Sequence, residues 1–330
     1  MRLARLLVSA LFAVGCVRAE GLPDLGDAAQ SDFSPLQERR VGDEVMRSIR
    51  NSGALLDDPE IDQYLNGLGY RLLKDTPTGG QDFQFFVIRD RTLNAFALPG
   101  GYIGVHTGLI ATARTESELA SVLAHEIGHV TQRHLARMVA AQKQSTIPSL
   151  AAMAAAILAA SYNPQLANAA LTAVQAGAVQ RQINFTREHE READRIGLQI
   201  LHSAKFDVHA MPEFFERLQR FNRFYDNNAP AYLRTHPLTT ERIADIENRL
   251  LTLPYRQVTD SLDFQLLRAK LHASDGTPLQ AVKFFEENPL NFGFPEVKRY
   301  GLTSALLRAS QIERAAQEFA RLAPDMPPNP

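Results

Sequence analysis

The pentapeptide His-Glu-Ile-Gly-His at residues 125–129 constrains this chain more than any other feature of its sequence. On an α-helix, positions i and i+4 lie on one face, about 40° apart around the axis. His125 and His129 can therefore hold one zinc ion through their imidazoles, while Glu126 is turned to the side, where it can act as a base on water. Apolar residues recur at helical spacing around this motif, so we predict one helix over residues 116–139.

A catalytic zinc ion needs a third protein ligand, which leaves one position open for water. The extended pattern HExxHxxGxxH does not supply it, because Gln132 and Leu135 stand where glycine and the third histidine are expected. His134 would lie about 180° around a continuous helix from His125, which makes it a poor ligand. A second predicted helix, over residues 187–201, is a better source of the third ligand.

Two neighbouring residues of this second helix are candidates for the third ligand. By helical angle, His189 lies about 35° and Glu190 about 65° from the centre of the apolar face, so both remain possible. Asp194 is one turn from Glu190 on the same side, where it can accept a hydrogen bond from a histidine ligand and orient it.

The chain has 330 residues, enough for two domains. We expect a mostly helical α+β fold, in which an HExxH metalloprotease domain with a small β-sheet spans residues 20–255. A short helical region that resembles tetratricopeptide repeats is expected over residues 256–330. The net charge is −2 and there is no stretch rich in Arg or Lys, so the composition gives no indication of nucleic-acid binding.

Local patterns place further elements before the HExxH motif. Helices are predicted over residues 35–50 and 58–74, the second capped by an aspartate and opened by a proline. An aromatic, β-branched run predicts a strand over residues 83–88. A turn-rich segment at 94–101 then leads to a short strand over 102–105, which we expect to be an edge strand.

Residues 144–180 contain no charged side chain and are rich in alanine. A proline at position 164 divides this run into pieces of about 14 and 16 residues, each too short to cross a membrane. The division argues against an integral membrane protease. It favours two helices packed on the protease core, and the alternative is a mobile lid or a surface that meets a membrane-protein client.

A weak repeat marks the C-terminal region, where Ala281 and Phe285 recur 34 residues later as Ala315 and Phe319. This period suits tetratricopeptide helix pairs. Two such units are only marginally stable by themselves, so we expect them to pack against the protease domain, a partner or a second chain. The alternative is a plain helical subdomain.

The first 19 residues combine a positively charged start with an apolar run, as in a secretory signal peptide. Val-Arg-Ala at residues 17–19 is a suitable cleavage site, so the mature protein is predicted to begin at Glu20 and to reside in the periplasm. The competing interpretation is a lipoprotein anchored through Cys16, which follows an imperfect lipobox.

The HExxH motif, followed about sixty residues on by Glu-Arg-Glu-Ala-Asp at 190–194, resembles the HExxH…ExxAD pattern of a zinc metallopeptidase family. That family includes the heat-shock protease HtpX and the CAAX prenyl proteases. Residues 94–101 and the Thr-His-Pro at 235–237, with Arg242, also match. The secreted layout with helical repeats is similar to that of periplasmic members of the family that act on outer-membrane proteins.

The resemblance implies roles for individual residues. Glu190, rather than His189, becomes the zinc ligand, so that the domain is of the gluzincin type. Asp194 becomes a second catalytic residue. His236 is placed beside the zinc, either to stabilise the oxyanion or to fill the fourth coordination position in a latent enzyme. Arg242 could assist His236 in stabilising the oxyanion.

Two functions of different class follow from these observations. The first is a periplasmic endopeptidase with one Zn²⁺ per chain that degrades misfolded or stalled outer-membrane proteins and assists their assembly, with the assembly machinery as a possible partner of its repeats. Its substrate would pair through backbone hydrogen bonds with the strand over 102–105. The second is a chaperone or adaptor with a largely silent zinc site. Glu126 favours the enzyme, because a binding module has no need of a base there.

Overall fold

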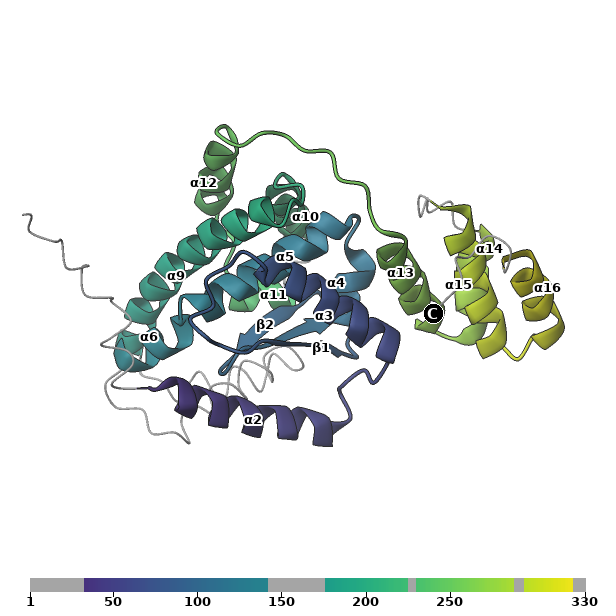
Figure 1. Ribbon diagram of the computed structural model, residues 1–330, viewed down its shortest axis with the longest axis horizontal. Coiled ribbons are helices and arrows are strands. Elements are labelled where there is room, and N and C mark those ends of the chain that lie inside the picture. The colour runs from purple at the N-terminus through teal and green to yellow at the C-terminus, as the bar shows by residue number, and fades with distance from the viewer. Residues whose placement is uncertain (1–32, 142–175, 225–229, 288–293, 323–330) are drawn as a thin grey trace, which may run out of the picture.

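The computed structural model describes residues 33–141, 176–224, 230–287 and 294–322 (Figure 1). Within these ranges, helices surround one three-stranded sheet. The strands are β1 (Gln84–Ile88), β2 (Ala95–Leu98) and β3 (Tyr102–His106). The helices, in chain order, are α2 (Pro35–Ser52), α3 (Pro59–Leu73), α4 (Thr107–Thr112), α5 (Glu116–Thr131), α6 (His134–Ala141), α9 (Ala176–Ser203), α10 (Ala210–Phe224), α11 (Ala231–Thr235), α12 (Thr240–Leu250), α13 (Leu262–Ser274), α14 (Pro278–Glu287), α15 (Pro295–Arg308) and α16 (Ile312–Leu322).

The two helices predicted before the sheet are confirmed, together with the residues that begin them. Ser34 caps α2 in a capping box with Gln37, and Gly53 ends that helix in the left-handed conformation. The Asp58 side chain accepts hydrogen bonds from two backbone amides at the start of α3, where Pro59 occupies the first turn. These local signals are sufficient to fix where both helices begin.

The order of the sheet is β1-β3-β2, with β1 parallel and β2 antiparallel to β3. The turn-rich interpretation of residues 94–101 was therefore wrong for its first half, which forms β2. The turn itself is confined to residues 99–101, in which Gly100 and Gly101 have φ angles of 79° and 84°. The expectation that residues 102–105 form an edge strand was also wrong, because β3 is paired on both sides. The two edge strands are β1 and β2. Among the described residues, the segment around Leu55 bridges the outer side of β1 at Ile88, whereas the outer side of β2 has no bridge.

Alternate residues along the strands enter two separate cores on the two faces of the sheet. Phe85, Val87 and Ile103 belong to the larger core, which is shared with α3 and α5. Phe86 and Tyr102 belong to a second core that is covered by α2. The sheet is therefore sandwiched between α2 on one face and the helix of the HExxH motif on the other (Figure 1).

The predicted continuous helix over 116–139 was wrong, because it breaks directly after the HExxH motif. Helix α5 ends at Thr131, Arg133 adopts a left-handed φ of 50°, and α6 begins at His134. The Arg133 side chain donates hydrogen bonds to the buried Glu38 carboxylate and, over 2.7 Å, to the carbonyl of Phe33. This tertiary anchor stabilises a backbone conformation that the local sequence does not favour.

Helix α9 lies along α5, and it contains the predicted second helix over 187–201 (Figure 1). Two glycines permit the close approach. A Cβ atom on Gly128 of α5 would lie 3.0 Å from the Ala193 carbonyl oxygen, and one on Gly197 of α9 would lie 3.0 Å from the His125 nitrogen. This backbone contact sets the HExxH helix and the ExxAD helix at a fixed separation.

Helices α13 to α16 form the C-terminal part, which follows an extended segment after α12 (Figure 1). One side of α13 places Phe264 in the large core, and another places Ala269 in a separate core with α14, α15 and α16. Of the repeated pair of aromatics, Phe285 is buried, whereas Phe319 is 59% exposed. The tetratricopeptide assignment and the domain boundary at 255/256 stay predictions.

Several expectations fall on residues outside the described ranges. They are the export signal at 1–19, the alternative anchor at Cys16, and the uncharged segment at 144–180 apart from its last five residues, which begin α9. In the parts of the chain that the structure describes, no helix combines the length and hydropathy needed to cross a membrane.

Candidate metal centre

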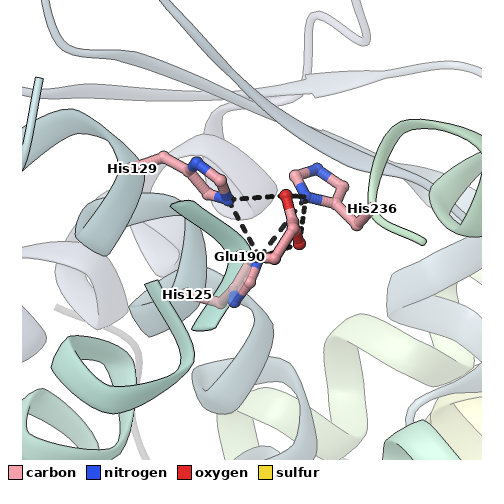
Figure 2. Close-up of side chains that lie close together, drawn as sticks. All are labelled: His125, His129, Glu190 and His236. Atoms are coloured by element: carbon pink, nitrogen blue, oxygen red, sulfur yellow. Dashed lines mark hydrogen bonds and ion pairs between the residues drawn. The ribbon is translucent and has the colours of Figure 1, made fainter. Parts of the chain in front are cut away.

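Four side chains from three parts of the chain converge at one point between α5 and α9. They are His125, His129, Glu190 and His236, and each offers one ligand atom within 4.8 Å of the others (Figure 2). His236 follows the short helix α11, and its backbone N–H donates to the Tyr232 carbonyl over 2.8 Å. Sequence analysis singled out all four of these residues, and the fold brings them together.

The atoms that face one another are those that would bind a cation. His125 and His129 present their Nε2 atoms 3.1 Å apart. Each of these nitrogens lies 3.4 Å from a carboxylate oxygen of Glu190. His236 presents Nδ1, at 3.1 Å from Glu190 Oε1. A buried set of imidazole and carboxylate donors fits a transition-metal ion, and the HExxH pair with one glutamate fits zinc.

The fold separates the two candidates for the third ligand. Glu190 is buried within the cluster, whereas His189 points elsewhere and stacks on His134, with ring centroids 4.2 Å apart and planes 3° apart. Burial raises the pKa of the Glu190 carboxyl, but charge interactions with His236 and Arg242 hold that pKa well below its ordinary value. Glu190 therefore carries the negative charge that a cation site requires.

Glu126 is fully buried beside the cluster. Its Oε1 lies 3.4 Å from His236 Nε2, and neither carboxylate oxygen has a hydrogen-bond partner among the described residues. A buried carboxylate without partners is costly, so such a group calls for a bound water or ligand. This observation fits a base that acts on water next to a metal ion.

Asp194 and Arg242 lie behind the cluster. Asp194 Oδ1 is 3.0 Å from His125 Nδ1, on the side of the imidazole away from the other ligands. The Arg242 guanidinium donates two hydrogen bonds of 2.7 Å to the Asp194 carboxylate and lies 2.9 Å from Glu190 Oε2. Burial raises the pKa of Asp194, but Arg242 outweighs it and lowers that pKa. These contacts favour a holding role over the direct role in catalysis expected for both residues.

Tyr232 is a buried neighbour of the site that sequence analysis missed. Its ring stacks on His236, with centroids 4.7 Å apart, and burial raises its pKa well above the ordinary value. The available signal was the i, i+4 spacing between the two residues, but the helix that carries Tyr232, α11, is only five residues long and ends directly before His236. Such a short segment is not recognisable from periodicity.

Comparison with known proteins agrees with the fold and the site. The model described as "Peptidase family M48" matches residues 59–250, from the first residue of α3 to the last of α12, and every residue of the cluster lies in this range. The resemblance predicted from the HExxH and ExxAD motifs is thereby confirmed.

Three relatives show how far the similarity extends. An Escherichia coli protein named "Beta-barrel assembly-enhancing protease" is 38% identical over 314 residues, or 94% of this chain. A Vibrio cholerae protein bearing the same name with a provisional qualifier is 40% identical over 312 residues, or 93% of this chain. This chain spans 64% of the length of both. "Mitochondrial metalloendopeptidase OMA1" of Schizosaccharomyces pombe is 32% identical over 187 residues, covering 57% of this chain and 52% of the relative.

Proposed function

Since the chain belongs to peptidase family M48, we propose that it is a zinc-dependent endopeptidase of the periplasm that degrades misfolded or stalled outer-membrane proteins and assists their assembly. The enzymatic part rests on the buried Glu126 carboxylate next to the cluster of His125, His129 and Glu190, because its oxygens have no hydrogen-bond partner in the described part of the chain. The names of the bacterial relatives, both beta-barrel assembly-enhancing proteases, support the substrate class.

The proposed ligands of one Zn²⁺ per chain are His125, His129 and Glu190. When bound, zinc polarises the scissile carbonyl and makes a water molecule easier to deprotonate. Glu126 then takes a proton from the attacking water and passes it to the leaving amine. Its burial keeps this carboxylate away from bulk solvent, where competing proton exchange would occur.

The residues behind the ligands hold them in place. The Asp194 carboxylate lies 3.0 Å from His125 Nδ1, which leaves Nε2 to face the metal. Arg242 binds Asp194 with two hydrogen bonds and also contacts Glu190, so one buried cation fixes two carboxylates. We therefore propose that Asp194 and Arg242 position the ligands of the catalytic centre.

For His236, we propose a restraining role in the resting enzyme. Its Nδ1 lies against Glu190 and its Nε2 against Glu126, so this side chain occupies the space beside both the third ligand and the base. Movement of the loop that carries it would admit substrate. The alternative is that His236 stabilises the oxyanion of the transition state.

The substrate is proposed to lie along β2, in place of the β3 strand expected from the sequence. β2 is the edge strand whose outer side has no bridge in the described part of the chain, whereas β1 is bridged by Leu55, and β2 packs against the HExxH helix α5. An extended segment can pair with this edge through backbone hydrogen bonds. Backbone pairing reads few side chains, so unfolded or extended clients are preferred over a defined sequence.

A second function, that of a chaperone or adaptor, is supported by the C-terminal helices. Four large apolar residues there are more than half exposed: Leu279, Leu307, Ile312 and Phe319. Such side chains are suited to contact clients or the outer-membrane assembly machinery. If this were the main function, the zinc site would have little catalytic activity.

Casein hydrolysis by wild type and by Glu126→Gln, with zinc content measured on both proteins, tests the proposed enzyme. We expect stoichiometric zinc in both and hydrolysis only by wild type, abolished by a chelator. Zinc-loaded wild type that hydrolyses no unfolded protein would instead favour the chaperone.

A further inference from the structure

A series of contacts runs outward from His129, on the side away from the four side chains of the candidate metal centre. His129 Nδ1 lies 2.9 Å from His134 Nδ1. His134 Nε2 lies 3.1 Å from Glu192 Oε2. The same oxygen accepts a hydrogen bond of 2.6 Å from Arg137 Nη1. A metal ligand, a second histidine, a carboxylate and an arginine are thus connected in series.

The break after α5 makes this arrangement possible. On a continuous helix, residues five positions apart lie about 140° apart, so His134 would point away from His129. The left-handed Arg133 redirects the chain, and α6 begins with its first side chain turned back toward the motif. The Glu38 contact that holds Arg133 is therefore also a support for His134.

The hydrogens along this series can be assigned in one consistent way. His129 presents Nε2 to the cluster, so its hydrogen belongs on Nδ1, which donates to His134 Nδ1. His134 must then carry its own hydrogen on Nε2, and this donates to Glu192. Each donor meets an acceptor, as is usual for buried polar groups.

The neighbouring residues restrict the His134 ring to this orientation. His134 is 4% exposed, and the parallel ring of His189 covers one of its faces. The arrangement parallels that at the other ligand, where His125 Nδ1 faces Asp194 directly. Both ligand histidines thus have an acceptor at Nδ1, a carboxylate in one case and a carboxylate-linked imidazole in the other.

We propose that His134 is a positioning residue for the metal ligand His129, and that Glu192 fixes the tautomer of His134 through which it acts. The inference rests on the proposed metal site and extends it by one histidine that is not itself a ligand. Partners that accept hydrogen bonds from metal-bound histidines typically contribute about 10–100-fold to metal affinity.

The test measures zinc affinity by competition with a chromogenic chelator, on the full chain. His134→Leu removes the acceptor, and we expect the affinity to fall about 10–100-fold. His134→Asn can place its amide oxygen near the former Nδ1, so it should recover most of this loss. The visible spectrum of the Co²⁺-substituted protein should change in the leucine variant and return toward wild type in the asparagine variant.

Glu192→Gln provides a second variant outside the core, in case His134→Leu fails to fold. We expect it to weaken zinc binding several-fold, while Glu188→Gln, the same change at an exposed position of α9, should have no effect. Wild-type affinity in folded His134→Leu, or equal losses in its leucine and asparagine variants, would overturn the inference. A wild-type protein that binds no zinc would overturn the proposed metal site instead.

Discussion

His236 Nε2 lies 3.4 Å from Oε1 of Glu126, the carboxylate proposed to activate water. A histidine in this place competes with water and substrate for the space next to the base. The distance is short enough for the two side chains to compete for the same space, although neither Glu126 oxygen has a hydrogen-bond partner among the described residues. We therefore expect the position of His236 to determine whether substrate can reach Glu126 in the resting enzyme.

Replacing His236 with alanine separates its two proposed roles. If the side chain restrains the resting enzyme, basal hydrolysis of casein should rise. If it stabilises the oxyanion, the rate should fall by about 10²–10³, as is typical when one such donor is lost. An unchanged rate would remove His236 from the mechanism.

Replacing Glu126 with glutamine should leave zinc bound and lower the rate by orders of magnitude, because only the base is lost. Zinc content and single-turnover peptide cleavage measure the two effects separately. Near-normal turnover in a zinc-loaded Glu126→Gln protein would contradict the mechanism.

The assignment of the third ligand is tested at two adjacent positions. Glu190→Ala should bind zinc weakly, because it removes an anionic donor of the cluster. His189→Ala should retain stoichiometric zinc, since that ring stacks on His134 outside the cluster. Metal analysis after dialysis provides the comparison, and the opposite pattern would exchange the two roles.

Replacing Gly197 with alanine should destabilise the protein by about 1–3 kcal/mol, because the new methyl group meets the His125 backbone nitrogen at 3.0 Å. The matched control is Gly67→Ala on α3, where a Cβ meets no atom within 4 Å. There we expect a gain of about 0.4–1 kcal/mol. Urea unfolding of both variants measures the difference, and equal stabilities would show that the helix contact tolerates a side chain.

Mass spectrometry of the processed protein tests the proposed export. A mature chain beginning at Glu20 supports cleavage after the Val-Arg-Ala at residues 17–19. A lipid-modified Cys16 would instead place the protein on a membrane surface through its acyl chains.

The parts of the structure that sequence could predict are those fixed by local chemistry. Asp58 and Pro59 indicate where α3 begins. The four-residue spacing of His125 and His129 places both imidazoles on one face of a helix. The family pattern also selected Glu190 over His189, which helical angles alone left unresolved. Each of these signals lies within a few residues of the feature that it specifies.

The parts that sequence could not predict depend on contacts between distant residues. Glu38 lies 95 positions before Arg133 along the chain, yet it stabilises the turn that ends the HExxH helix. The strand β2 was not predicted, because the Pro-Gly-Gly turn that follows it made the whole short segment resemble a turn. His134 was judged on a continuous helix, so its contact with His129 could not be anticipated.

Helix α13 belongs to two cores at once, since Phe264 lies in the core of the HExxH helix and Ala269 in that of the C-terminal helices. The part that contains the HExxH helix and the C-terminal helices are thus joined by a helix that packs in both cores. The Glu116 carboxylate, at the start of α5, also accepts a hydrogen bond from Ser261, the residue that caps α13. Because the two parts share α13 and are joined by this hydrogen bond to the first turn of the HExxH helix, we expect them to unfold in one transition.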